Sequence, residues 1–238
     1  MTARFQGPIL YPHSALNLAI FHLINGASGH HFLDVICSAI SDNGLARELI
    51  LACPYVYFWF QRSNLNARPT LVAGLFGGLV AVLAARALSH LLPFEQRPMY
   101  DLASGFHALS TPTAPDMEAW SAFPSDHAAL CIGLPLGLYR SNKLFSVVLA
   151  AVALIVFGLP RIYMGVHYPV DILAGGLVGL LCAILAGLPV TLPVWSRIVR
   201  LETWSAPVFY TASFLLLAEV SQMFDGLRNG VRALKSAL

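Results

Sequence analysis

Three short polar strings stand out in an otherwise apolar chain because they combine arginine, serine, histidine and aspartate. They read Gln96-Arg97-Pro98, Pro124-Ser125-Asp126-His127, and Arg161-Ile-Tyr-Met-Gly-Val-His167-Tyr-Pro-Val-Asp171. A phosphate ester resists attack because its oxygens are negatively charged, so a catalyst must neutralise them, align a nucleophile and protonate the departing oxygen. Arg97 and Arg161 suit the first task, since planar guanidinium groups bind phosphate oxygens in pairs. Either arginine alone could equally anchor its segment among lipid headgroups.

The two histidines of these strings can divide the remaining chemistry. His167 and Asp171 are four residues apart, and Pro169 between them suits the first position of a helix. This spacing brings the carboxylate within reach of the imidazole, which leaves the other ring nitrogen free to attack phosphorus. His127 then remains as the candidate general acid. A lone histidine near a membrane surface is more often structural, but this set of ionisable groups together favours a catalytic site.

Ser125 is expected to begin a helix, because it follows Pro124 and precedes an apolar run. The free backbone N–H groups of a first helical turn can bind an anion, and the serine hydroxyl adds one more donor. Ser125 can also serve only as the cap of that helix. The two roles are compatible, since a capping turn is also an anion site.

The composition sets the class of the protein. Hydrophobic residues make up 57% of the 238 residues and charged residues 11%, whereas soluble domains carry about 25% charged residues. The apolar runs are long and unbroken, which indicates a helical membrane protein in a lipid bilayer rather than a barrel. The net charge of +2 gives no indication of a nucleic-acid partner. The four cysteines lack metal-like spacing and are expected to be free thiols.

We expect an all-α, polytopic membrane fold with about six transmembrane helices. The candidate spans are 45–61, 70–92, 125–139, 144–160, 169–188 and 206–223. Two shorter helices are expected at about 14–24 and 30–42. The chain is then one domain over 1–238, with short helices in 1–44, a catalytic core in 45–188 and an extra apolar segment at 206–223.

The alternation of spans brings the three strings to one side of the membrane. The end of the second span, the start of the third, the end of the fourth and the start of the fifth share that side. The opposite side is rich in basic residues and has a single acid, Glu202; the basic residues are Arg62, Arg68, Arg140, Lys143, Arg197 and Arg200. By the positive-inside rule that side is cytoplasmic, which puts the strings outside. The string side is acidic, with Asp42, Glu95, Asp101, Asp116 and Glu118, although Arg228, Arg232 and Lys235 of the tail run against this bias.

At these residues the chain resembles the type 2 phosphatidic acid phosphatase (PAP2) family, which shares its site with vanadium haloperoxidases. The family pattern is Lys, six residues and Arg-Pro; then Pro-Ser-Gly-His; then Ser-Arg, five residues, His, three residues and Asp. Matching positions here are Arg97, Pro98, Pro124, Ser125, His127, Arg161, His167 and Asp171. The matches frame roughly 90–171, in the family's order and spacing.

The resemblance implies a helical-bundle enzyme that hydrolyses a lipid phosphate without a metal or other cofactor. His167 would form a phosphohistidine, Asp171 would orient it and His127 would protonate the leaving group. The phosphate would be held by Arg97, Arg161, Ser125 and the residues at two further family positions, Asp126 and His90.

The chain departs from the family pattern at three positions. His90 stands at the family lysine, so a permanent positive charge is lost there, and Arg86, one helical turn earlier, is a candidate to supply it. Pro160 replaces the serine before the third-motif arginine. Asp126 replaces the glycine, where we expect its backbone N–H to remain the donor. Glu219, inside the last apolar run, is a candidate partner for Arg86.

The Pro-Ser-Asp-His variant, preceded by Phe123, resembles the bacitracin-resistance branch of undecaprenyl-diphosphate phosphatases, as do Ile24-Asn25-Gly26 and Leu33-Asp34. That branch recycles the lipid carrier of cell-wall synthesis on the outer face of the bacterial cell membrane. The nearest alternatives are phosphatidate, phosphatidylglycerophosphate or a lipid A phosphate as substrate. A non-catalytic relative is a more distant alternative, given His90 and Pro160. So is a transporter, because the ionisable residues other than Arg86 and Glu219 cluster at span ends.

Overall fold

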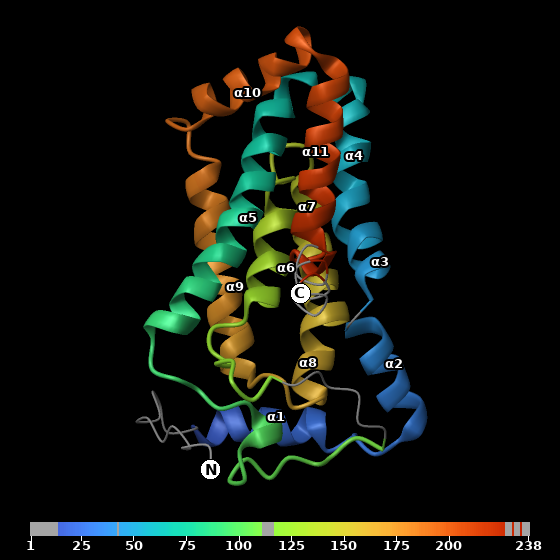
Figure 1. The fold of residues 1–238 in the computed structure, drawn as a ribbon, viewed down its shortest axis with the longest axis vertical. Helices are drawn as coiled ribbons and strands as arrows, with labels where there is room; N and C mark the ends of the chain where they lie inside the picture. The colour runs from blue at the N-terminus through green and yellow to red at the C-terminus, as the bar shows by residue number, and fades with distance from the viewer. Residues whose placement is uncertain (1–13, 42, 111–116, 227–229, 231–233, 235–238) are drawn as a thin grey trace.

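The fold is known from a computed structural model that describes residues 14–41, 43–110, 117–226, 230 and 234. Every regular element in those ranges is a helix, as the sequence predicts. Five charged residues used in the orientation argument lie outside the described residues: Asp42, Asp116, Arg228, Arg232 and Lys235. The ends of α5 and α8 and the starts of α6 and α9 meet at one end of the bundle (Figure 1).

Three helices form the centre of the bundle, namely α5 (Arg68–Leu91), α6 (Asp126–Leu136) and α9 (Pro169–Ala186). Glycines at their contacts permit a close approach. A Cβ on Gly175 of α9 would collide with the carbonyl oxygen of Ser125, and one on Gly179 would collide with that of Ala129. Small residues let helix backbones approach closely within a membrane. This packing fixes the start of α6, and with it Ser125, against α9.

Two composite helices flank this centre, and each contains one π-helical turn. Their segments are α3 (Gly44–Arg47), η1 (Glu48–Ala52) and α4 (Cys53–Phe60), and then α7 (Lys143–Ala153), η4 (Leu154–Gly158) and α8 (Leu159–Tyr163). Each π turn ends just before a proline-bearing turn, with Pro54 and Pro160 as the second residue of the next helix. Proline has no N–H for the carbonyl four residues earlier, and a π turn accommodates that lost bond.

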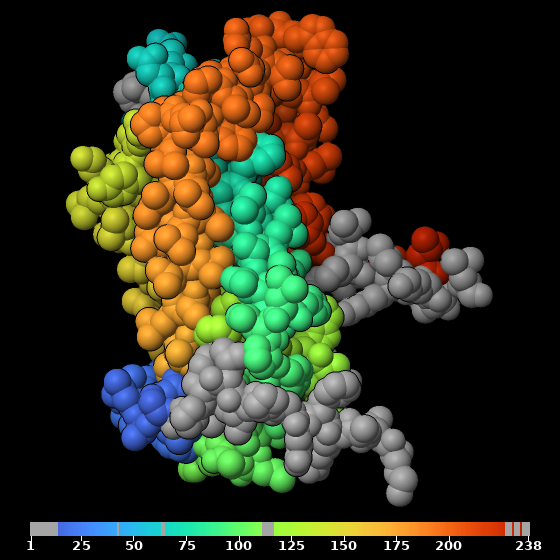
Figure 2. Space-filling model, turned by 90° about the vertical axis from the view of Figure 1, so that its left-hand side faces the viewer, coloured from blue at the N-terminus to red at the C-terminus, as the bar shows by residue number. Residues whose placement is uncertain are grey.

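One of the last two helices crosses the end of the bundle opposite the motifs, and the other runs back toward the motif end. The 3-10 turn η2 (Arg62–Ala67) joins α4 to α5 at the end opposite the motifs, and α10 (Leu192–Trp204) crosses that end. Then α11 (Ala206–Ser221) runs back along the bundle toward the motif end (Figure 1). Figure 2 shows α5 beside α9 on one face, with α10 across the upper end and α1 at the lower end.

Two short helices brace the motif end, at the positions that the sequence predicts. They are α1 (Ala15–Asn25) and α2 (His31–Ser41). The Asn25 amide donates to the Tyr163 carbonyl at 2.8 Å, and the Tyr163 hydroxyl donates to the buried Asp34 carboxylate at 2.6 Å. Ser110 of the long loop also donates to Asp34, through N–H and hydroxyl. These bonds fix the loop, which includes the 3-10 turn η3 (Pro98–Tyr100), against α8.

Among the described residues, three helices are long and apolar enough to cross a membrane by length and composition. They are Leu65–Leu91, Lys143–Tyr163 and Pro169–Ala186. The other three predicted spans are also helical, but α6 has 11 residues and α11 has 16. The chain is therefore a helical membrane protein, and its described part has three candidate spans of full length.

Candidate active site

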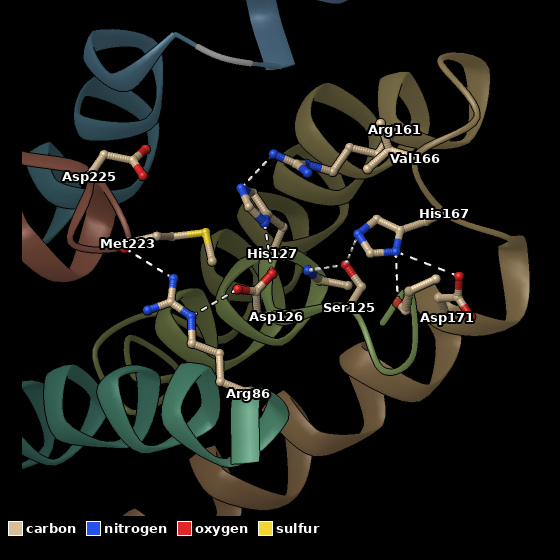
Figure 3. Close-up of polar contacts among 12 residues, drawn as sticks. Arg86, Ser125, Asp126, His127, Arg161, Val166, His167, Asp171, Met223 and Asp225 are labelled. Atoms are coloured by element: carbon tan, nitrogen blue, oxygen red, sulfur yellow. Dashed lines mark hydrogen bonds and ion pairs between the residues drawn. The ribbon is translucent and has the colours of Figure 1, made fainter. Parts of the chain in front are cut away.

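His167 lies in the turn between α8 and α9 with only 2% of its surface exposed. Its Nδ1 is 2.9 Å from the carbonyl oxygen of Ala122, and its Nε2 is 3.3 Å from the Ser125 hydroxyl. A carbonyl oxygen can only accept, so Nδ1 carries the hydrogen and Nε2 keeps its lone pair in the neutral ring. Burial, followed by the charges of Arg97 and Arg161, holds the pKa of His167 well below 6.5. The ring is therefore neutral, with Nε2 directed at the start of α6 (Figure 3).

Asp171 lies below the same ring, as the four-residue spacing predicts, but it is not the nearest acceptor. Its Oδ2 is 3.5 Å from Nδ1 of His167 and accepts a shorter bond, 2.7 Å, from the backbone N–H of Tyr168. The carboxylate is fully buried. Asp171 therefore fixes the turn that carries His167, and the carbonyl of Ala122 shares the task of holding the ring.

Ser125 caps α6, and its hydroxyl accepts from the backbone N–H of Ala128 at 3.4 Å. Its own N–H donates to the carbonyl of Asp171 at 3.1 Å, which joins the start of α6 to the start of α9. The same hydroxyl faces Nε2 of His167. The capping role and the position beside the histidine thus occur together.

Asp126 and His127 form the second half of the cluster. Oδ1 of Asp126 is 2.9 Å from Nδ1 of His127, and Oδ2 accepts from Nε of Arg86 at 3.0 Å. A carboxylate on Nδ1 leaves Nε2 of His127 as the nitrogen that faces outward. The Asp126 side chain thus positions a histidine and an arginine, a role that the sequence did not predict.

Two arginines converge on Nε2 of His127. Arg161 of α8 approaches it at 2.6 Å, and Arg47 at the end of α3 approaches it at 3.3 Å. Arg161 was predicted from its motif, whereas Arg47 was missed because it belongs to no motif and follows a short polar stretch. Its only sequence signal is an arginine at the start of an apolar run.

Arg97 donates to the carbonyl oxygens of three loop residues. The distances are 2.9 Å to Val166, 3.2 Å to Trp120 and 3.4 Å to Ser121. Burial lowers its pKa, but guanidinium groups stay charged at neutral pH. Arg97 therefore ties the turn before His167 to the long loop, and its charge lies beside the site.

The structure does not bring His90 into this cluster. Its side chain is exposed on the last turn of α5, where the centroid of its ring lies 6.5 Å from that of Trp120. Arg86 occupies the place beside Asp126 instead, and it also donates to the carbonyl of Met223 at 3.1 Å. The suggested pairing of Arg86 with Glu219 is wrong, because Arg86 forms its ion pair with Asp126, and Oε2 of Glu219 has no hydrogen-bond partner among the described residues.

The contacts confirm that three strings distant in sequence meet at one end of the bundle (Figure 3). Across the part of the chain that the structure describes, no group of three or more His, Cys, Asp or Glu side chains is placed to hold a metal ion. Residues 70–190, which contain all three strings, match the PAP2 superfamily. The chain belongs to the PAP2 superfamily.

Relatives of this PAP2 protein include two bacterial phosphatases. It is 34% identical to undecaprenyl-diphosphatase BcrC of Bacillus subtilis over 178 residues, which cover 71% of this chain and 82% of that protein. It is 28% identical to the putative undecaprenyl-diphosphatase YbjG of Escherichia coli over 197 residues, which cover 79% and 90%. The resemblance to the bacitracin-resistance branch is thereby confirmed.

The PAP2 fold also has a counterpart among solved structures. The crystal structure of Aquifex aeolicus LpxE matches with a TM-score of 0.52 and 28% sequence identity, and the match covers 72% of this chain and 94% of that one. Family, relatives and fold agree, so the protein is a membrane lipid phosphatase of the PAP2 superfamily.

Proposed function

We propose that this PAP2 protein hydrolyses undecaprenyl diphosphate to undecaprenyl phosphate and phosphate, through a phosphohistidine on Nε2 of His167. The proposal depends chiefly on one observation. Nδ1 of His167 is held by a carbonyl oxygen, and the lone pair of Nε2 faces the capped start of α6 beside Ser125. The two undecaprenyl-diphosphatases among the relatives supply the substrate class.

The residues around Nε2 suggest how the terminal phosphoryl group is held. The Ser125 hydroxyl and the first-turn N–H groups of α6, including that of Asp126, can donate to its oxygens. Arg161 contacts the outward nitrogen of His127, so its guanidinium lies where phosphate oxygens would enter. Arg97 supplies a second buried charge below. His90 is exposed, so we assign Arg86 rather than His90 to the family lysine position.

The reaction then proceeds in two displacements. Nε2 of His167 attacks the terminal phosphorus, and the bond from phosphorus to the bridging oxygen breaks. In the structure Nε2 of His127 accepts from guanidinium groups, so His127 first takes up a proton there as Arg161 turns to the phosphate oxygens, and it then passes that proton to the bridging oxygen. Lipid monophosphate leaves. A water molecule next gives a proton to His127 while its oxygen attacks phosphorus, the P–N bond breaks and phosphate is released. Asp171 and Asp126 keep the two imidazoles oriented throughout.

We place the site on the outer face of the bacterial cell membrane, with six spans. Besides the three full-length spans, we count the helical segments Gly44–Phe60 and Ala206–Ser221 as spans. The sixth is α6, at the centre of the bundle. At 1.5 Å per residue a 16-residue helix is about 24 Å long, close to the thickness of a thin hydrocarbon core. The basic residues Arg68 and Arg140 at the opposite end support a cytoplasmic position for that end.

Phosphate release from the purified full chain in detergent tests this proposal. Undecaprenyl diphosphate and phosphatidate are compared for the wild type, for His167→Ala and for the control His107→Ala, whose side chain is exposed on the loop. We expect release chiefly from the diphosphate, lost in His167→Ala and retained in the control. Release chiefly from phosphatidate would keep the mechanism and reject the substrate.

A further inference from the structure

Arg47 is buried at the motif end of α3 although no motif contains it. Only 3% of its surface is exposed. One terminal nitrogen donates to Oδ2 of Asp225 at 2.8 Å, and the other lies 3.3 Å from Nε2 of His127. Its Nε is buried and has no hydrogen-bond partner among the residues that the structure describes. Arg47 is thus a buried cation with one terminal nitrogen toward His127 and an unused donor at Nε.

The arrangement leaves two like charges close together. Arg47 and Arg161 approach the same imidazole nitrogen, at 3.3 and 2.6 Å, so their guanidinium nitrogens lie within about 6 Å of each other. Like charges at this distance repel unless an anion lies between or beside them. Asp225 supplies such an anion to Arg47 from one side, with 34% of its side chain exposed.

Asp225 reaches Arg47 through a turn that follows α11. Met223 and Phe224 have left-handed backbone conformations, with φ of 58° and 63°. The carbonyl of Met223 accepts from Arg86. Figure 3 shows Met223 and Asp225 on the His127 side of the cluster, away from His167. The turn therefore lies beside His127, the residue that protonates the leaving oxygen in the proposed function.

We infer that Arg47 binds the leaving phosphate of a lipid diphosphate, and that Asp225 occupies this second phosphate site when the substrate is absent. The inference rests on the proposed function, in which His127 protonates the bridging oxygen. The leaving group of a diphosphate is a phosphate monoester, whose negative charge would bind Arg47. The leaving group of phosphatidate is an uncharged alcohol, which gives a buried arginine no partner.

A purely structural ion pair explains these contacts less well. An ion pair with Asp225 requires only one edge of the guanidinium, whereas Arg47 turns its other terminal nitrogen toward the nitrogen of His127 that handles the proton. That nitrogen of His127 is also the one that Arg161 contacts. Arg161 and Arg47 are therefore suited to two adjacent phosphoryl groups, one on either side of the bond that breaks.

Ligand binding to the full chain in detergent tests this inference without turnover. The probes are inorganic phosphate and methylenediphosphonate, whose bridging carbon prevents hydrolysis, and their dissociation constants follow from the rise in unfolding temperature. We expect Arg47→Gln to weaken methylenediphosphonate about tenfold or more, the effect of losing one charge-assisted bond, and phosphate by less than about twofold. Asp225→Asn should strengthen methylenediphosphonate binding, and the exposed control Arg140→Gln should change neither constant.

The two variants have opposite expected signs, so general damage to the fold cannot imitate the result. Equal weakening of both probes in Arg47→Gln, or weaker diphosphonate binding in Asp225→Asn, would overturn the inference. If Arg47→Gln does not fold, Arg47→Lys gives the same comparison with the charge retained and the paired donors lost. These outcomes are independent of phosphate release from undecaprenyl diphosphate, so a failure of the inference and a failure of the proposed function can be told apart.

Discussion

Removal of the Asp126 carboxylate should slow turnover by a factor that the structure allows us to estimate. Its two oxygens hold Nδ1 of His127 at 2.9 Å and Nε of Arg86 at 3.0 Å. In the proposed mechanism the first bond keeps the proton of His127 in place and stabilises the ring when it is charged. A hydrogen bond to a charged group contributes about 1.5–3 kcal/mol, and about 1.4 kcal/mol corresponds to a tenfold change in rate. We therefore expect Asp126→Ala to lower kcat by about 10- to 150-fold.

Asp126→Asn separates the two contacts. The amide oxygen can still accept from His127, but the amide nitrogen then faces Arg86 with a second donor. We expect a loss of about three- to tenfold in kcat, between those of the wild type and Asp126→Ala, because a neutral acceptor replaces a charged one. The informative result is the order of the kcat values, which should be highest in the wild type, lower in Asp126→Asn and lowest in Asp126→Ala.

The assay is steady-state phosphate release in detergent, with kcat and KM determined separately. Glu118→Gln, an exposed acid of the loop before α6, serves as the control, and the unfolding temperature of each variant shows whether the fold is intact. The reasoning is refuted if a folded Asp126→Ala protein keeps kcat within about threefold of the wild type.

Two further predictions follow from the buried groups. Asp171→Asn should lower kcat far more than it raises KM, because Asp171 orients the turn that carries His167; an unchanged kcat would remove Asp171 from the mechanism. His167 should also make stability depend on pH. Its pKa in the folded protein is well below 6.5, so the unfolded chain binds more protons below about pH 6.5 and stability falls as the pH is lowered, by at most about 1.4 kcal/mol per pH unit. The unfolding temperature should therefore fall less between pH 7 and 5 in His167→Asn than in the wild type, and parallel curves would contradict the assignment.

The sequence predicted the fold well where apolar runs and motifs coincide. The helices at 70–92, 144–160 and 169–188 have the length of a span, and their alternation was enough to bring the three strings together. The sequence also predicted three further spans, whose helices are shorter in the structure. Helix length within an apolar run depends on where prolines, caps and turns interrupt the backbone. Pro54 and Pro160 produce π turns in place of breaks, which hydropathy does not reveal.

The parts of the site that the sequence missed have a common physical cause. They depend on contacts between segments far apart in the chain, without a local pattern. The carbonyl of Ala122 holds His167 from 45 residues away, and Arg47 meets Asp225 from 178 residues away. The Arg86–Glu219 hypothesis failed because Arg86 pairs with Asp126 and the carbonyl of Met223, which no local pattern reveals. His90 was chosen by motif alignment alone, and the helix directs it to the surface.

Trapping of the covalent intermediate tests the central claim most directly. Undecaprenyl diphosphate labelled in its terminal phosphate is mixed with the full chain, quenched within milliseconds in alkaline denaturant and analysed by mass spectrometry. The account predicts a labelled phosphoryl group on the peptide that contains His167, on Nε2, and none in His167→Ala. A wild-type enzyme that releases labelled phosphate while the peptide stays unlabelled, or a label on His127, would contradict it.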